Sequence, residues 1–479
     1  RSRFETSPRP FLVKGKERAI TAYSVGALVG VAEEEQAEEL SLVGREQEVD
    51  ELRAALEAAR LRQGQVAELV GEPGIGKSRL VEELKTMAVG FTQLVTHCDQ
   101  YASSVPYFPF RKLLRPLAGI TEAESAAEAG ARLKPWVEAV MPDFAPWLPL
   151  LAAPFDAEVP ATAESDEIRA NFRRERLFET VEQFLHRVLM MPTLLVVEDA
   201  HWMDDASREL LRHLVASAEP RPWLLTITRR PDSDPFLNGG GSGHRLIELS
   251  ALPSAAASRL ALAAAGDLAL SQELLGEVAE RSGGNPLFVR ELVAASRGGV
   301  AALPETVETL ITTRIDTLEP GDRFLLRNAS VLGAQFELDL LADVLADELE
   351  DVGDLDRWRR LGEFVAWEGT NTLRFRHDLF RTVAYEGLSF RRRREIHGRL
   401  ATVLERRAGA GAVELAPQLS LHFLQAEDYE KAWRYSVAVG ELAQRRSANV
   451  VAAELYERAL AAADHLELPP TEVARVAEA

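Results

Sequence analysis

The stretch that decides the fold is VAELVGEPGIGKSRL at residues 66–80, in which residues 71–78 have the G-x-x-x-x-G-K-[ST] spacing of a phosphate-binding P-loop. An apolar, strand-like run, Val66–Val70, precedes the loop, and a helical stretch begins at Arg79. Glycines let the backbone curl so that its N–H groups face phosphate oxygens, and the helix N-terminus adds positive potential. The spacing and its context therefore predict a nucleoside-triphosphate site.

The residues of this loop have distinct expected roles. Lys77 is expected to reach the β- and γ-phosphates and to assist catalysis, while the Ser78 hydroxyl coordinates Mg²⁺. The expected ligands are therefore ATP or ADP together with Mg²⁺. The predicted nucleotide-binding residues of the loop are Gly71, Gly74, Ile75, Gly76, Lys77, Ser78 and Arg79.

A second apolar run, Leu194–Val197, ends in the acids Glu198 and Asp199. Acids at the end of a buried parallel strand lie at the carboxyl edge of the sheet, where ligands bind. One acid can hold Mg²⁺, directly or through water, and the other can orient the attacking water. We predict that Glu198 shares the metal with Ser78 and that both acids are catalytic, with their division of labour left open.

A pair of arginines follows the next strand-like run, Trp223–Thr228. Either Arg229 or Arg230 could sense the γ-phosphate from the end of that strand. The alternative is that both are ordinary surface arginines. Trp202, which follows the acid pair, is expected in the core because large aromatic side chains are mostly buried there.

The strand-like runs alternate with helical stretches over the first half of the chain. Besides the three runs above, Gln93–His97 and Leu246–Leu249 have strand character. Short apolar strands that alternate with helices predict an α/β domain with a parallel sheet and helices on both faces. The long stretch from Tyr101 to Leu189 is predicted to be a mostly helical insertion.

Composition and charge bound the possible functions. The chain has 479 residues and a net charge of −20, which argues against nucleic acid as a partner. It has no apolar run near the ~18 residues that a membrane span needs, and its single cysteine fits a reducing, cytoplasmic setting. Because the chain begins with Arg1 and not Met, we expect a piece of a longer protein.

These motifs together resemble the signal-transduction ATPases with numerous domains, the STAND branch of the AAA-related P-loop ATPases. The resemblance is carried by the segments Val43–Glu46, Gly71–Leu80, Leu195–Trp202, Arg229–Pro231, Gly284–Leu287 and Phe375–Leu379. It implies that Val43 and Gly44 contact the nucleotide, that Pro286 packs near adenine, and that His377 contacts the β-phosphate in a closed state. The alternative for His377 is a core histidine bonded to a nearby carbonyl.

The resemblance and the sequence patterns give a domain organisation. A hairpin pattern, Phe364–Trp367 and Leu373–Arg376, follows two helical stretches and is typical of a winged helix. The predicted parts are a tail over 1–30, an acidic linker over 31–41, a P-loop ATPase domain over 42–252, a helical lid over 253–303, a winged-helix domain over 304–405, and helical repeats from 410 to 479.

The last part of the chain is predicted to be helical pairs similar to tetratricopeptide repeats, although a generic helical hairpin remains an alternative. Such repeats would bind a protein partner or support self-assembly. The start of the chain, Val13–Tyr23, resembles the last strands of a class III adenylate or guanylate cyclase domain.

We therefore expect an ATP-binding, slowly hydrolysing switch in the regulatory part of a nucleotide cyclase. The alternatives are the ATPase region of a large LuxR-type transcription regulator and a scaffold that binds nucleotide without turnover.

Overall fold

The computed structural model describes residues 2–11, 20–31, 42–216, 221–236, 243–266, 270–297, 306–349, 351–409, 415–445 and 449–478. The strands are β1 (Ser2–Phe11), β2 (Ile20–Val31), β3 (Gln65–Val70), β4 (Thr92–His97), β5 (Thr193–Glu198), β6 (Trp223–Arg229), β7 (His244–Glu248), β8 (Gln335–Glu337), β9 (Val365–Trp367) and β10 (Thr372–Phe375). The helices are α1 (Glu46–Arg60), α2 (Lys77–Met87), α3 (Phe108–Leu114), α4 (Ala126–Val140), α5 (Leu148–Phe155), α6 (Ala163–Glu167), α7 (Ala170–Val188), α8 (Asp205–Ala216), α9 (Ser254–Ala265), α10 (Gln272–Arg281), α11 (Pro286–Arg297), α12 (Val307–Thr317), α13 (Pro320–Ala329), α14 (Leu338–Leu345), α15 (Leu355–Arg360), α16 (Asp378–Glu386), α17 (Phe390–Ala408), α18 (Ala416–Gln425), α19 (Tyr429–Arg445), α20 (Asn449–Ala463) and α21 (Pro470–Ala477). Short 3₁₀ helices span Gln100–Ala102, Arg115–Ala118, Pro142–Trp147 and Ala200–Trp202.

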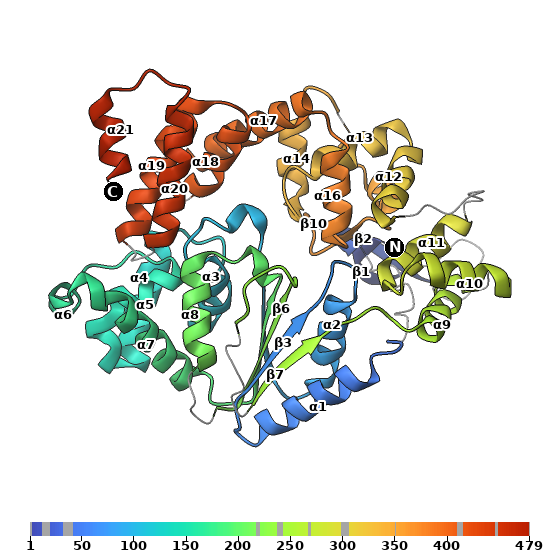
Figure 1. Cartoon of the computed structure of the whole chain (residues 1–479), viewed down its shortest axis with the longest axis horizontal. Coiled ribbons are helices and arrows are strands. Elements are labelled where there is room, and N and C mark those ends of the chain that lie inside the picture. Colours follow the sequence, from blue (N-terminus) through green and yellow to red (C-terminus); the bar gives the residue numbers. More distant parts are fainter. Residues whose placement is uncertain are drawn as a thin grey trace.

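The centre of the molecule is a five-stranded parallel sheet with the order β4-β5-β6-β3-β7 (Figure 1). All five strands coincide with the strands predicted from the sequence. Their residues alternate between two buried faces, so that Leu194 and Val196 of β5 join one core cluster while Leu195 and Val197 join another. The predicted α/β fold with a parallel sheet is therefore confirmed.

Helices cover both faces of this sheet (Figure 1). Helices α1 and α2 pack on one face, and α3, α7 and α8 pack on the other together with the rest of the insertion between β4 and β5. The insertion is helical throughout its regular elements, as predicted, and its capping box at Ser125 and Glu128 starts α4.

Two helical modules follow the sheet. Helices α9, α10 and α11 share one core cluster with Val43, which lies just before α1. Helices α12 to α17 surround a second cluster that includes a three-stranded antiparallel sheet with the order β8-β10-β9. The predicted hairpin is β9 and β10, whereas the three-residue strand β8 was not predicted because it is too short to show a period. We call residues 306–405 the hairpin module.

The C-terminal helices α18, α19 and α20 pack side by side. Gly440 on α19 lets Tyr456 of α20 approach closely, because a Cβ at Gly440 would lie 2.4 Å from the ring. The buried small residues Ala432 and Ala459 serve the same close packing. Their core is continuous with that of the insertion, so these helices pack on the insertion between β4 and β5.

The first part of the chain forms an antiparallel hairpin of β1 and β2. Of the segment that resembles the last strands of a cyclase domain, residues 20–23 lie in β2, and residues 13–19 lie outside the described residues. The predicted acidic linker also lies outside them, except for Val31, which ends β2.

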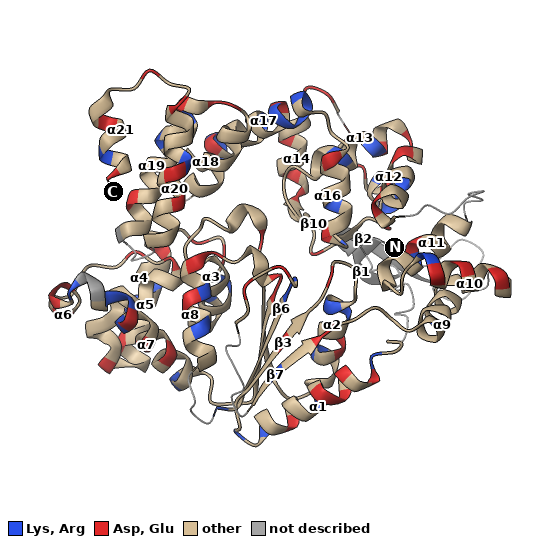
Figure 2. Cartoon of the chain, viewed as in Figure 1, with Lys and Arg blue, Asp and Glu red and all other residues tan. Residues whose placement is uncertain are grey.

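Two properties concern the surface as a whole. No helix among the described residues is long and apolar enough to cross a membrane. Figure 2 shows acidic residues on helices in different parts of the molecule, such as α1, α10 and α20, so the net charge of −20 is spread over the surface.

Candidate nucleotide-binding site

The loop between β3 and α2 has the backbone of a phosphate cradle. Gly74 and Gly76 have φ values of 77° and 106°, which side-chain-bearing residues rarely adopt. A Cβ at Gly71 would lie 2.7 Å from the Ile75 side chain, so glycine is required there by space. Within the part of the chain that the structure describes, no heavy atom beyond the neighbours of Gly76 lies within 4 Å of a Cβ position there, which leaves room in front of the helix N-terminus.

Lys77 and Ser78 begin α2 directly after this loop. The ammonium of Lys77 donates hydrogen bonds to the backbone carbonyls of Gly71, at 2.6 Å, and Glu72, at 3.1 Å. Burial lowers the pKa of Lys77, and the charge of Asp199 opposes that effect. The lysine is therefore held over the loop and close to the acid pair, as its predicted phosphate role requires.

The acid pair at the end of β5 lies beside these residues. Glu198 is buried, and burial, followed by the charge of Asp199, raises the pKa of Glu198 to about 7. A hydrogen bond with the Ser78 hydroxyl acts in the opposite direction. The structure therefore brings together the two residues that were predicted to share a metal ion.

Asp199 has an unusual backbone. Its φ of 54° is in the left-handed region, and its N–H donates a hydrogen bond of 2.9 Å to the hydroxyl of Thr228 on the neighbouring strand β6. Burial raises the pKa of Asp199, while Lys77 lowers it. Left-handed conformations in residues other than glycine are strained and concentrate at functional sites.

The two arginines at the end of β6 have different surroundings. Arg229 is buried and forms an ion pair with Glu68 of β3, and its guanidinium also donates to the Ser233 carbonyl at 2.9 Å. Arg230 points instead toward the site, where it affects the pKa of Lys77 and lies 5.6 Å from the centre of the Trp202 ring. Of the two predicted γ-phosphate sensors, Arg230 alone faces the nucleotide residues; the pairing with Glu68 gives Arg229 a structural role.

The segment before α11 contacts the P-loop. The side-chain amide of Asn285 donates to the Pro73 carbonyl at 3.0 Å, and the Leu287 N–H donates to the Gly74 carbonyl at 3.2 Å. Pro286, the first residue of α11, is thus placed beside the loop.

The opening segment 43–45 lies at the same junction. Gly44, with a φ of 70°, packs so closely on Ala256 of α9 that a Cβ would be 2.8 Å away. The buried Arg45 donates to the carbonyls of Ile75, at 3.3 Å, and Ser250, at 2.6 Å. The predicted nucleotide contacts Val43 and Gly44 are therefore close to the P-loop and to α9.

His377 precedes α16 of the hairpin module and packs edge-on against Phe380, with ring centres 5.3 Å apart. Burial, and then the charge of Arg290 on α11, lowers the pKa of His377 to about 4, so the imidazole is neutral at pH 7. It faces the helix that Pro286 begins. Its predicted phosphate contact stays a prediction.

The neighbouring Asp378 does reach the site, which the sequence did not indicate. Its carboxylate accepts a hydrogen bond of 2.7 Å from Arg230, and its charge affects the pKa of Asp199. A 3.1 Å ion pair with Arg381 of the same helix holds the carboxylate in place.

Arg374 of β10 makes a second unpredicted contact between the hairpin module and the site. Its guanidinium nitrogens lie 3.1 Å from both ring nitrogens of His97, at the end of β4. His97 Nδ1 in turn lies 3.6 Å from the Glu198 carboxylate. The charge of Arg374 lowers the pKa values of both Glu198 and Asp199.

His201 is a further buried residue near the site that the sequence motifs did not indicate. Neither ring nitrogen has a hydrogen-bond partner among the described residues, although both are buried. Burial, followed by the charge of Arg230, lowers the pKa of His201 to about 4. Its position two residues after Asp199, in EDAHW at 198–202, is the signal that could have found it.

A nucleotide and Mg²⁺ fit this arrangement. The open space at Gly76 faces the first turn of α2, and the hydroxyl and carboxylate oxygens of Ser78 and Glu198 are the ligand types that Mg²⁺ prefers. Arg79 is turned along α2 toward Glu83, at 3.5 Å, so its predicted contribution would come from its backbone N–H.

Comparisons with known proteins find similarity to an ATPase domain. Residues 41–227 match the family described as AAA ATPase domain. An uncharacterized protein of Rhizobium meliloti (strain 1021) is 28% identical over 464 residues, which cover 88% of this chain and 42% of that protein. The chain thus spans less than half the length of this curated relative.

The solved structures that this chain matches have low sequence identity to it. The STAND protein with a tetratricopeptide repeat sensor from Pyrococcus horikoshii is 14% identical, with a TM-score of 0.48 over 91% of this chain and 60% of that one. CDC6P from Pyrobaculum aerophilum is 14% identical, with a TM-score of 0.34 over 74% of this chain and 96% of that one. The match to the AAA ATPase domain and the geometry of the P-loop concern the same part of the chain, residues 41–227.

Proposed function

We propose that this chain is an ATP-binding and slowly hydrolysing switch, in which the nucleotide at the P-loop controls how the hairpin module sits on the ATPase domain. The observation that carries the proposal is the ion pair between Arg230 of the site and Asp378 of the hairpin module. Its guanidinium nitrogen and carboxylate oxygen are 2.7 Å apart. A ligand that competes for Arg230 would weaken this contact, and so change the balance between two arrangements.

The chemistry would use the residues described above. Backbone N–H groups of the loop and Lys77 would bind the phosphates, and Mg²⁺, held by Ser78 and Glu198, would neutralise phosphate charge. Asp199, whose backbone is fixed by Thr228, would orient the attacking water. Arg230 would approach the γ-phosphate when it leaves Asp378.

The contact of Arg374 supports a coupling of the same kind. In the arrangement described, the cation of the hairpin module stabilises the charged forms of Glu198 and Asp199. A metal ion bound at these carboxylates would stabilise their charged forms more strongly. We therefore infer that Mg-ATP and the docked hairpin module oppose one another, whereas ADP, which lacks the γ-phosphate, is compatible with docking.

The output of the switch depends on parts of a longer protein. We propose a nucleotide cyclase upstream, on the resemblance of residues 13–23, which lie mostly outside the described residues. A LuxR-type transcription regulator is the alternative output. In either case the C-terminal helices would receive a protein input or support self-assembly.

The direct test of nucleotide binding is Lys77→Ala in calorimetry with Mg-ATP. We expect a loss of affinity of tenfold or more, since Lys77 supplies a charge-assisted hydrogen bond worth ~1.5–3 kcal/mol. Lys85→Ala is the matched control, because Lys85 lies on the same helix but pairs with Glu82 at its surface. Equal affinities for parent and Lys77→Ala would refute the site.

A further inference from the structure

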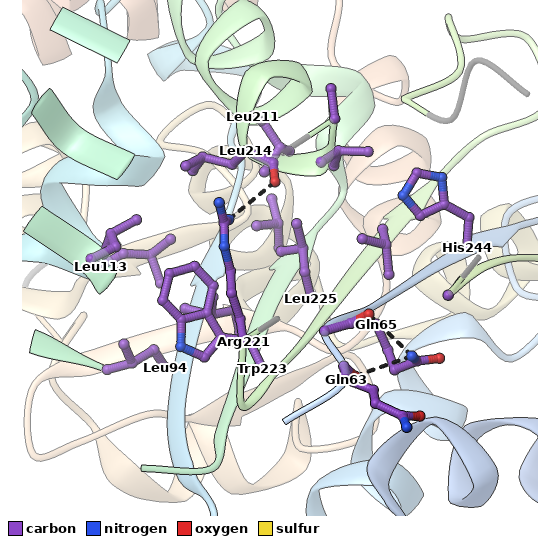
Figure 3. Close-up of a pocket in the computed structure, with 18 of the residues that line it drawn as sticks. Gln63, Gln65, Leu94, Leu113, Leu211, Leu214, Arg221, Trp223, Leu225 and His244 are labelled. Atoms are coloured by element: carbon purple, nitrogen blue, oxygen red, sulfur yellow. Dashed lines mark hydrogen bonds between the residues drawn. The ribbon is translucent and has the colours of Figure 1, made fainter. Parts of the chain in front are cut away.

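A cavity of about 600 Å³ lies on the face of the sheet that α3, α7 and α8 cover (Figure 3). Protein interiors are packed as closely as organic crystals, and spaces larger than a water molecule are few. A volume of ~300–1,000 Å³ is typical of sites for small molecules. The cavity lies within the AAA ATPase domain, but nothing in the nucleotide site uses it.

Aliphatic side chains make up most of the wall. Strands contribute Leu195, Val197 and Leu225, and the helices contribute Leu113, Leu185, Leu211 and Leu214. Several of these side chains keep a small exposed fraction, 7% for Leu113 and Leu195 and 8% for Leu225, although they belong to a core cluster. Their remaining surface faces the cavity, which is therefore suited to an apolar group.

The polar residues of the wall gather at one edge of the sheet. They come from the segments 62–65, 221–223 and 243–245, which immediately precede or begin β3, β6 and β7. These are the amino ends of parallel strands, whereas the P-loop follows the carboxyl end of β3. The cavity and the nucleotide site are thus on opposite edges of one sheet.

Positive side chains gather at this edge. Among the described residues, the wall contains Arg62, Arg221, which pairs with Glu182, and Arg245, together with His244, and no aspartate or glutamate. The electrostatic potential at this mouth is therefore favourable for an anion.

The cations differ in how firmly they are held. Arg221 pairs with Glu182 and lies over the Trp223 ring at 4.9 Å, so it is part of the wall. Arg245 donates a hydrogen bond to a neutral amide, that of Gln65, and forms no ion pair with the described residues.

His244 precedes Arg245 in β7, so the two side chains leave opposite faces of the strand, and both line the cavity where the strand begins (His244 in Figure 3). Its Nδ1 atom is buried without a hydrogen-bond partner among the described residues. A buried nitrogen of this kind is normally satisfied by a partner.

We propose that this cavity binds an apolar small molecule with one anionic group, an amphiphile of the fatty-acid class. Its hydrocarbon part lies against the leucines of the strands and helices. Its carboxylate lies beside Arg245 and accepts a hydrogen bond from the His244 ring. The ligand would thus satisfy the buried nitrogen and fill the cavity at once.

The charge requirement is tested with three probes of equal chain length: dodecanoate, dodecan-1-ol and dodecyltrimethylammonium, each titrated calorimetrically below its micelle concentration. Dodecanoate binds best, and Arg245→Gln lowers its affinity roughly tenfold, as loss of one charge-assisted bond requires, while the affinity for dodecan-1-ol stays within about twofold. Equal affinity of the parent for all three probes, or no binding of dodecanoate, overturns the proposal.

The location is tested with two neighbouring residues of β6 that face opposite sides of the sheet. Leu225 lines the cavity, whereas Leu224 is fully buried in the cluster under α1 and α2. Leu225→Trp extends into the cavity, so dodecanoate affinity falls at least tenfold while the melting temperature stays at or above that of the parent. Leu224→Trp overpacks a full core and lowers the melting temperature.

Nucleotide binding serves as the check that each variant is folded. If Leu225→Trp binds dodecanoate as the parent does, the ligand lies elsewhere. If it loses as much thermal stability as Leu224→Trp, the cavity is not open space. Either result overturns the proposal without affecting the proposed switch, because the P-loop is at the other edge of the sheet.

Discussion

Arg229 and Arg230 are adjacent in sequence but have different roles. Arg229→Met leaves Glu68, which is fully buried, without its ion-pair partner. Breaking a buried pair from one side typically costs about 3–5 kcal/mol, so we expect a loss of this size in urea unfolding. Arg230→Met removes a half-buried pair with Asp378 and should cost less than about 1 kcal/mol, but it should slow ATP turnover. Equal unfolding free energies for the two variants would contradict this distinction.

The roles of Glu198 and Asp199 can also be distinguished by single substitutions. Glu198 bonds to Ser78, so Glu198→Gln should weaken the dependence of nucleotide binding on Mg²⁺. Asp199→Asn should retain Mg-ATP and reduce the single-turnover hydrolysis rate by 10²-fold or more, as expected for loss of a general base. Rapid-quench measurements at saturating Mg-ATP give the rate. A parental rate in Asp199→Asn would transfer the water-positioning role to Glu198.

At the scale of elements, α17 and α18 are joined by two buried histidines. His397 Nδ1 and His422 Nδ1 are 2.8 Å apart, and the Tyr385 hydroxyl contacts His397 Nε2 at 3.0 Å. Burial lowers the pKa of His397 to about 4 and that of His422 well below its usual value. Because of these lowered pKa values both rings are neutral at pH 7, and one of the two facing nitrogens donates its hydrogen to the other.

The stability of this helix pair should therefore depend on pH. The unfolded state binds protons near the ordinary histidine pKa of ~6.5, and the folded state resists them until about pH 4. The contribution of the neutral histidine pair to the free energy of unfolding is fully present above pH 6.5. It is lost progressively as the pH drops from 6.5 toward 4. We expect His422→Asn to flatten this part of the pH profile of the unfolding free energy.

The control for that profile is His465→Gln, which changes an exposed histidine on the same group of helices. Groups with raised pKa values, Glu198 at about 7 and Asp204 at about 6, give an opposite slope, but they are common to all variants. If His422→Asn and His465→Gln lose the same stability between pH 7 and pH 5, the histidine pair is not responsible.

At the scale of the whole molecule, the hairpin module is attached to the ATPase domain by polar contacts at the site. Besides Arg230–Asp378, the guanidinium of Arg381 donates to the Gln100 side chain at 2.9 Å. We expect Asp378→Asn to release the module, and small-angle scattering with ADP should give a larger radius of gyration than the parent. His377→Ala should have the same effect if His377 contacts the β-phosphate.

Asp339→Asn is the control for this measurement, since Asp339 contacts Asn371 within the hairpin module. It should leave the radius of gyration unchanged. If Asp378→Asn remains as compact with ADP as the parent, the contact with Arg230 does not hold the two parts together.

The sequence by itself determined the local features. A glycine loop between an apolar run and a helix is recognisable because the strand, the turn and the helix each impose a period or a residue type within a few positions. The five strands of the sheet and the positions of Lys77, Ser78, Glu198 and Asp199 followed from such patterns. The strand β8 did not, since three residues are too few to carry a period.

Only the tertiary structure decided which of these residues contact side chains that are distant in sequence. Arg374 reaches His97 across 277 positions, and Arg230 reaches Asp378 across 148. The different roles of Arg229 and Arg230 depend on Glu68 of a neighbouring strand, and the cavity depends on side chains from the strands β3 to β7 and the helices α1, α3, α7 and α8. No local pattern records these contacts, because the packing of distant elements, and not the residue's neighbours in sequence, determines which charge or space a side chain faces.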